Sequence, residues 1–122
     1  MGAVPQYFEA MKSYDWAVLR ACLTDDFTRD GPYEEHVFGD PETYIRFLAE
    51  LLPTLRGQVV ELTRLGRDGD VVYSELTETI EVDGKPHTIR GCASFELADD
   101  GLIRHVEVFV RRLPRAQEAP AA

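Results

Sequence analysis

The sequence predicts an α+β fold in which three N-terminal helices pack on a strongly curved, mainly antiparallel sheet. Apolar residues recur at helical spacing up to Pro53, and they alternate with polar residues after Gly57. Hairpin turn signals divide the alternating part at Asp68-Gly69, Asp83-Gly84 and Asp99-Asp100-Gly101. Because successive hairpins pair neighbouring strands, these turns predict a meander, one face of which the helices cover.

Two helices are expected at the N-terminus. The first begins at Pro5, a residue suited to a first helical turn. Its apolar face comprises Tyr7, Phe8 and Met11. The second is capped by Asp15, and we expect Asp25 and Asp26 to lie where the chain leaves it. Its apolar stripe comprises Trp16, Leu19 and Leu23.

The third helix has the strongest start signal. Gly39 precedes Asp40, which is a suitable cap, and Pro41 takes the first turn. The helix is expected to end before Pro53. Its buried face comprises Tyr44, Phe47, Leu48 and Leu51.

Four strands follow, at about residues 58–66, 70–83, 85–98 and 101–112. Residues 1–113 are expected to form a single domain, which suits a chain of 122 residues. The tail PRAQEAPAA is small and polar, so we expect residues 114–122 to be disordered.

Composition restricts the classes of partner. The chain has 13 basic and 22 acidic residues, and its formal net charge of −9 would repel the phosphates of nucleic acids. No apolar run approaches the roughly 20 residues that span a bilayer, and the N-terminus lacks the pattern of a secretory signal. We therefore expect a soluble, cytoplasmic protein that binds neither nucleic acid nor a membrane. Cys22 and Cys92 have no metal-binding spacing, and both are expected to be buried thiols.

Four stretches carry a resemblance to a known superfamily. They are YFEAMKSYDWAVLRACLTDDF, GDPETYIRFL, VDGKP and DDGLIRHVEVF. With the order helix, helix, short strand, helix and meander, they resemble the nuclear-transport-factor-2-like (NTF2-like) superfamily over residues 5–112. This superfamily includes SnoaL-like polyketide cyclases, ketosteroid isomerases and limonene epoxide hydrolases. The resemblance implies a cone with a cavity between helices and sheet, but its motifs discriminate poorly among activities.

Strand alternation predicts which residues face this cavity. A two-residue turn at Asp83-Gly84 would pair Glu78 with Ile89 and Leu76 with Gly91. The small residues Gly91 and Ala93 would leave room for a ligand, the alternative being close packing beneath a helix. The residues expected to face inward are Leu76, Ile80, Val82, Ile89, Gly91, Ala93, Val106, Val108 and Val110.

Glu78 is the sharpest single signal, because it is the one carboxylate on this apolar face of its strand. A carboxylate among aliphatic side chains loses hydration, and such groups often serve as acids or bases. His87 is expected on the same face, diagonally from Glu78, where the two would exchange protons near neutral pH. The alternatives are a structural ion pair for Glu78 and an exposed position at the rim for His87.

The resemblance to ketosteroid isomerases suggests two further candidates. Tyr7 falls where those enzymes place a tyrosine that donates to the developing oxyanion, although aromatic residues there also serve packing. Asp30 is the candidate base, but Gly31 stands between it and Pro32, whereas in those enzymes the base directly precedes a proline. Their second oxyanion donor falls near Ala93, whose side chain cannot donate.

Asp30 belongs to an acidic stretch that runs from Asp25 to Gly39. Beyond Asp30, this acidic stretch is expected to be a turn at Gly31-Pro32 and a solvated loop containing Glu34, Glu35 and His36. These three adjacent residues do not suggest a metal site. We expect Tyr33 and Phe38 to close the mouth of the cavity over an apolar ligand.

Two functions are consistent with these observations. The first is a SnoaL-like enzyme that performs cofactor-independent cyclisation, isomerisation, dehydration or epoxide opening on an apolar, oxygen-bearing metabolite such as a polyketide, terpenoid or steroid. Its candidate catalytic residues are Glu78, Asp30, Tyr7 and His87. The alternative is a non-catalytic ligand-binding or assembly module. In either case Tyr73 and Phe109, on the outer sheet face, suggest a homodimer.

Overall fold

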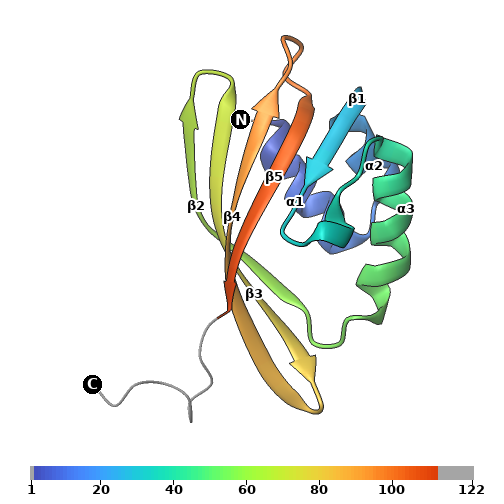
Figure 1. The fold of residues 1–122 in the computed structure, drawn as a ribbon, viewed down its shortest axis with the longest axis vertical. Helices are drawn as coiled ribbons and strands as arrows, with labels where there is room; N and C mark the ends of the chain where they lie inside the picture. The colour runs from blue at the N-terminus through green and yellow to red at the C-terminus, as the bar shows by residue number, and fades with distance from the viewer. Residues whose placement is uncertain (1, 113–122) are drawn as a thin grey trace.

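The computed structural model describes residues 2–112 and has the predicted α+β architecture, three helices packed on one curled sheet (Figure 1). The helices are α1 (Ala3–Ser13), α2 (Trp16–Ala21) and α3 (Pro41–Leu51), and the single-turn 3-10 helices are η1 (Glu34–His36) and η2 (Leu52–Thr54). The strands are β1 (Leu23–Asp30), β2 (Val59–Asp68), β3 (Val71–Val82), β4 (Lys85–Leu97) and β5 (Ile103–Arg112). The tail predicted to be disordered lies outside the described residues.

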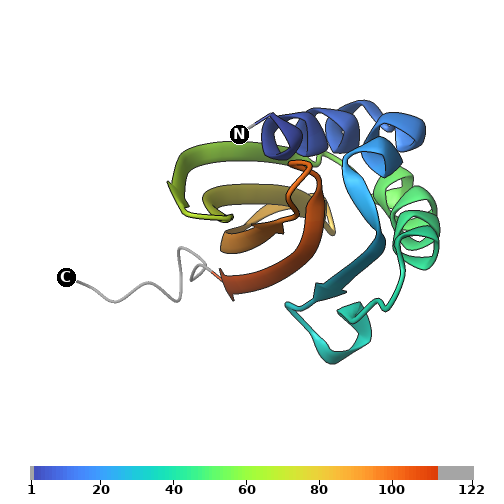
Figure 2. The ribbon, with the colours of Figure 1, turned by 90° about the horizontal axis from the view of Figure 1, so that it is seen from above.

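The five strands form one sheet in the order β1-β5-β4-β3-β2. β1 runs parallel to β5, and the remaining pairs are antiparallel, as hairpins require. Figure 2 shows the sheet curling upon itself, with α1 running across its open side and α3 beside β1. Among residues 2–112, no helix combines the length and the apolar character needed to cross a bilayer.

Both predicted caps are confirmed. The Asp15 side chain accepts a hydrogen bond from the Val18 amide at 3.2 Å, at the start of α2. Asp40 accepts one from the Thr43 amide at 2.7 Å, and Pro41 is the first residue of α3. These side chains satisfy amides that the first helical turn leaves without partners.

The end of α2 corrects the expectation for the acidic stretch. The helix stops at Ala21, and Leu23 begins β1 opposite Ile103 of β5 instead of extending the helical stripe. Asp25 and Asp26 therefore lie within a strand. Backbone pairing with β5 takes the place of a further helical turn, and local apolar spacing does not reveal such a distant partner.

The register of the β3–β4 hairpin is confirmed residue for residue. Val82 pairs with Lys85, Glu78 with Ile89 and Leu76 with Gly91. Asp83 and Gly84 both have positive φ angles, 54° and 75°, as a two-residue turn that matches the sheet twist requires. The inward face of β3 follows from this register.

The outer face of the sheet is accessible. Tyr73 and Phe109 expose 47% and 56% of their surface. Cys22 is buried as expected, but the expectation for Cys92 is wrong, because this thiol is exposed beside Phe109. Since Gly91 and Ala93 face inward on β4, alternation turns Cys92 outward.

Candidate functional site

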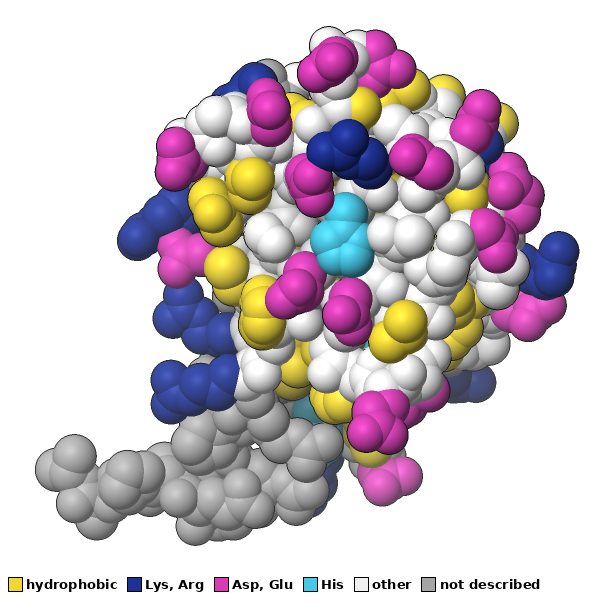
Figure 3. Space-filling model, turned by 45° about the horizontal axis from the view of Figure 1, so that its top comes forward, with side chains coloured by type: hydrophobic (Ala, Val, Ile, Leu, Met, Phe, Trp, Pro, Cys, Tyr) yellow, Lys and Arg dark blue, Asp and Glu magenta, His cyan; other side chains and the backbone are white. Residues whose placement is uncertain are grey.

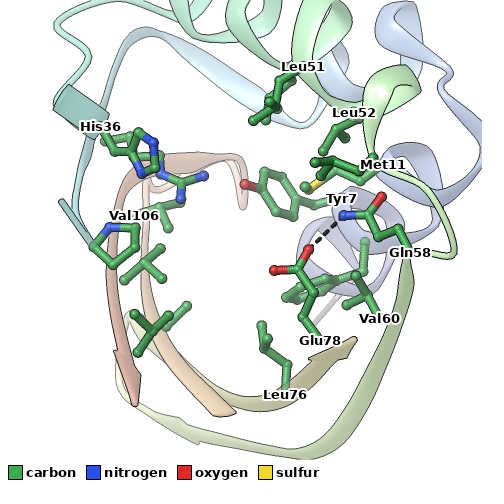
Figure 4. Close-up of a pocket in the computed structure, with 18 of the residues that line it drawn as sticks. Tyr7, Met11, His36, Leu51, Leu52, Gln58, Val60, Leu76, Glu78 and Val106 are labelled. Carbon is green, nitrogen blue, oxygen red and sulfur yellow. Dashed lines mark hydrogen bonds between the residues drawn. The ribbon is translucent and has the colours of Figure 1, made fainter. Parts of the chain in front are cut away.

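A cavity of about 520 Å³ lies between the curled sheet and the N-terminal helices, open at one side. Apolar side chains make most of its walls, and Figure 4 shows Leu51, Leu52, Leu76 and Val106 around it. The volume is that of a site for a small organic molecule. Two groups of hydrogen-bonded polar side chains lie at different places on the wall.

The first group is Glu78 and Gln58. Glu78 projects from β3 into the cavity, and its Oε2 accepts a hydrogen bond of 2.6 Å from Gln58 Nε2 (Figure 4). Gln58 directly precedes β2, the strand that pairs with β3. A neutral amide therefore compensates part of the lost hydration of the carboxylate. Within residues 2–112, Glu78 Oε1 has no hydrogen-bond partner and is available to a ligand.

The second group joins three elements that are distant in sequence. Tyr7 of α1 shares a hydrogen bond with Tyr44 of α3, and Arg29 Nη1 of β1 donates to the Tyr44 hydroxyl at 2.7 Å. Arg29 Nε also donates to the Gly31 carbonyl at 3.1 Å. Tyr7 and Arg29 line the cavity, whereas Tyr44 is fully buried behind them. One arrangement of the protons runs from Arg29 through Tyr44 to Tyr7 and leaves the Tyr7 O–H to a ligand.

Two titratable groups of this region have displaced pKa values. Burial, and next the negative charge that Tyr44 would carry if ionised, raise the pKa of Tyr7 well above its usual value. Tyr7 therefore remains a hydroxyl donor at neutral pH. Burial, and next the charge of Arg29, lower the pKa of His36, so its imidazole is neutral at pH 7.

Most of the residues predicted to face the cavity line it. These are Tyr7, Tyr33, Leu76, Glu78, Ile89, Ala93, Val106, Val108 and Val110. Tyr33 lies at the mouth, where 51% of its surface remains exposed. Its ring meets that of His36 edge-on, with centroids 5.2 Å apart.

Six other predicted residues do not line the cavity, and one of them, Val82 at the end of β3, is 41% exposed. Ile80 and His87 pair with each other near the tip of the β3–β4 hairpin, which projects beyond the helices (Figure 1). Phe38 is buried against Tyr44 instead of closing the mouth. Gly91 faces inward, but the Leu76 side chain covers it, because an added Cβ would lie 3.2 Å from Leu76 Cδ1.

The last of these six residues is Asp30, which is exposed at the end of β1. The parallel register sets Asp30 beside Glu107 and Arg29 beside Val106. Val106 faces the cavity, so the residue beside it does too. Arg29 thus has the inward position that the comparison with ketosteroid isomerases suggested for Asp30.

Several polar residues of the site were not predicted, and Gln58 and Lys12 are among them. Arg29 and Tyr44 belong to the second group, and His36 lies in η1 on the cavity wall instead of in a solvated loop (Figure 4). His36 packs against Phe47 of α3, with ring centroids 5.3 Å apart. A sequence signal existed for Arg29, since it has the parity of the buried Phe27 two residues earlier.

A family model described as the SnoaL-like domain matches residues 4–106. The chain therefore belongs to the SnoaL-like domain family, as the resemblance of its motifs predicted. A comparison with curated proteins finds no match.

Solved structures with the NTF2-like fold are similar to most of the chain. An LEH-like epoxide hydrolase of M. tuberculosis has a TM-score of 0.73 and 23% identity, over 89% of this chain and 80% of that one. A proposed ketosteroid isomerase of Kribbella flavida has a TM-score of 0.76 and 24% identity, over 99% and 82%. A proposed polyketide cyclase of Sinorhizobium meliloti has a TM-score of 0.73 and 21% identity, over 88% and 94%. At these identities the similarity establishes the fold alone.

Proposed function

We propose that this chain is a SnoaL-like enzyme that performs acid–base chemistry on an apolar, oxygen-bearing small molecule without a cofactor. The observation that carries the proposal is the Glu78 carboxylate on an otherwise mostly apolar wall, with Oε2 held by Gln58 and Oε1 free. A positioned carboxylate of this kind is suited to remove a proton from carbon. The named activities of the structural neighbours, epoxide hydrolysis and proposed isomerisation and cyclisation, support this class of chemistry.

In the proposed reaction, Glu78 Oε1 takes a proton from the carbon next to a carbonyl group, and the electron pair moves to the carbonyl oxygen. Tyr7 and Arg29 carry donors that stabilise this oxygen. If the substrate has a β,γ double bond, the resulting dienolate takes the proton back from Glu78 at its γ-carbon, and the double bond moves into conjugation with the carbonyl group, which completes an isomerisation. In a cyclisation, the enolate carbon attacks a second carbonyl group, and the proton ends on the new hydroxyl.

Proton transfer is testable without knowledge of the natural substrate. Three apolar ketones, 2-tetralone, 1-indanone and 2-decalone, are incubated in D₂O, and deuterium at the α-carbon is followed by NMR. Wild-type protein is expected to accelerate exchange of at least one ketone, and Glu78→Gln is expected to lower that rate by about 100-fold.

Glu75→Gln is the matched control, because Glu75 lies on the same strand and its side chain pairs with Arg64 at 2.9 Å, away from the cavity wall. Its exchange rate is expected to equal that of wild type. Equal rates in wild type and Glu78→Gln would remove Glu78 from the chemistry.

A ligand-binding module is the second candidate, because Ala93 offers no side-chain donor and the Tyr7 hydroxyl is already engaged by Tyr44. In that case the ketones would bind without accelerated exchange, and Glu78→Gln would change affinity alone. The homodimer suggested by Tyr73 and Phe109 stays a prediction, and light scattering after size exclusion measures it directly.

A further inference from the structure

Arg29 brings a positive charge to the cavity without a carboxylate to balance it. The ion pairs among residues 2–112 involve Lys12, Arg20, Arg64 and Arg104, and none includes Arg29. Its two hydrogen bonds go to neutral oxygens, the Tyr44 hydroxyl and the Gly31 carbonyl. A guanidinium has more N–H donors than these two bonds use. An ion withdrawn from water without a counter-charge is costly, so such a site favours an anion.

The charge of the cavity differs from that of the molecule. Acidic side chains are scattered over the face shown in Figure 3, and the chain as a whole carries −9. Among residues 2–112, by contrast, the cavity wall has two cations, Lys12 and Arg29, and one carboxylate, Glu78. An anion that the outer surface repels would therefore meet net positive charge inside.

The charge of Arg29 acts across the cavity wall. It is one of the causes that lower the pKa of His36, after burial. The neutral imidazole adds no further positive charge at pH 7, so Arg29 and the more exposed Lys12 remain the cations of the wall. Lys12 Nζ lies 3.9 Å from Glu9 Oε1, and this carboxylate partly balances the charge of Lys12. Arg29 forms no ion pair with a carboxylate among the described residues.

The remaining wall selects for an apolar body. Leu76 of β3, Ala93 of β4 and Val108 of β5 belong to three neighbouring strands. Leu48 and Leu52 line the helical side of the cavity. A volume of about 520 Å³ accommodates a ligand of two or three fused rings. The walls therefore suit an apolar ligand with one acidic group.

We propose that the cavity binds an apolar ring compound carrying one carboxylate, or an equally acidic enol or phenol, with its anionic oxygen on Arg29 and its rings against β3, β4 and β5. The inference rests on the proposed function in that it names the class of substrate. Binding is nevertheless measured without turnover. The two proposals can therefore fail separately.

The test compares two probes of the same shape, 2-naphthoate and the neutral 2-naphthamide, by calorimetric titration at pH 7. Wild-type protein is expected to bind the naphthoate at least about 10-fold more tightly, the gain of one charge-assisted bidentate contact. Equal affinities, or no binding of either probe up to about 10 mM, would overturn the proposal. This comparison does not depend on any variant folding.

Variants then assign the preference to a residue. Arg29→Gln is expected to abolish the preference for naphthoate while the amide binds within about 2-fold of wild type. Arg64→Gln, which removes a cation from the outside of the molecule, is expected to keep the preference. A preference that persists in a folded Arg29→Gln variant would contradict the assignment.

Glu78→Gln separates the two proposals. Removal of the one carboxylate on the wall is expected to tighten naphthoate binding and to leave the amide unchanged. Loss of ketone exchange without any preference for naphthoate would support the proposed function and reject the ligand class. Preference for naphthoate without any effect of Glu78→Gln on exchange would do the reverse.

Discussion

The two polar groups of the cavity wall are built in different ways. Glu78 and Gln58 belong to neighbouring segments of a regular antiparallel pair, and one hydrogen bond joins them. Arg29, Tyr44 and Tyr7 come from β1, α3 and α1 and are joined by two hydrogen bonds. The first group depends on a hairpin register, and the second on how helices and an edge strand dock. Perturbation of the docking should therefore affect the second group more.

The largest effect is expected at Gly31, which holds the end of β1 against β5. Its φ angle is +85°, and an added Cβ would lie 2.4 Å from the Val108 carbonyl oxygen. Gly31→Ala is expected to destabilise the fold by more than about 2 kcal/mol in urea unfolding, because both backbone strain and a clash with main chain oppose it. It should also weaken naphthoate binding, since the Gly31 carbonyl accepts from Arg29.

Gly66→Ala is the control for this effect. Gly66 lies in β2, and an added Cβ there meets nothing within 4 Å. The free energy of unfolding of Gly66→Ala is expected to differ from that of wild type by no more than about 0.5 kcal/mol. Similar losses in the two variants would show that Gly31 has no special role in docking β1.

A second test removes the Tyr44 hydroxyl, which joins Arg29 to Tyr7 in the second polar group. Tyr44→Phe leaves Arg29 and Tyr7 without their shared partner, and the expected loss of unfolding free energy is about 1 to 3 kcal/mol. Tyr14→Phe, at a half-exposed ring whose hydroxyl makes a 3.4 Å contact to the Leu52 carbonyl, is expected to cost less than about 0.5 kcal/mol. Equal losses would mean that the buried Tyr44 hydroxyl contributes no more to the free energy of unfolding than the hydroxyl of a half-exposed tyrosine.

Mutation of the Glu78–Gln58 pair is expected to change the free energy of unfolding less than mutation of Tyr44. Gln58→Met removes the one donor to Glu78 found among the described residues, but the open cavity lets water replace it. The expected loss of stability is about 1 kcal/mol or less, measured by urea unfolding at pH 7. A larger loss of unfolding free energy in Gln58→Met than in Tyr44→Phe would contradict the expectation that the second polar group contributes more to stability than the first.

The smallest expected effect is a shift in the pKa of His36. NMR of assigned histidines is expected to give His36 a pKa below its usual 6.5, and Arg29→Gln should raise it because one of the two lowering causes is removed. The pKa of His36 is lower in the folded protein than in the unfolded chain, so as the pH falls the unfolded chain takes up this proton first. The free energy of unfolding therefore decreases as the pH drops from 6.5 through the pKa of the folded state. An unchanged pKa of His36 in Arg29→Gln would mean that the two side chains do not interact.

The inward position of Glu78 was predictable from the sequence, whereas the contacts that Gln58, Arg29 and Tyr44 make in the site were not. The turn at Asp83-Gly84 sets the register of β3 and β4, and alternation then orients Glu78. Period-two alternation is a local rule, so it extends from one turn along two strands. The helices were predictable for the same reason, because Asp15 and Asp40 cap amides within three residues.

The remainder depends on contacts between distant elements. β1 pairs with β5 about 80 residues later, with a register shift between Leu23 and Thr28, and this pairing turns Arg29 inward and Asp30 outward. Tyr44 was predicted to be buried, but its bonds to Arg29 and Tyr7 require three elements to meet. No local pattern in the sequence encodes such a meeting.

The most direct test is a crystal structure of the protein with 2-naphthoate bound. We expect the naphthoate carboxylate to lie on Arg29 and its rings to pack against Leu76 and Val108, with Glu78 Oε1 facing the ring system. Naphthoate bound outside the cavity, or bound inside with its carboxylate turned to solvent and away from Arg29, would contradict the proposed binding mode.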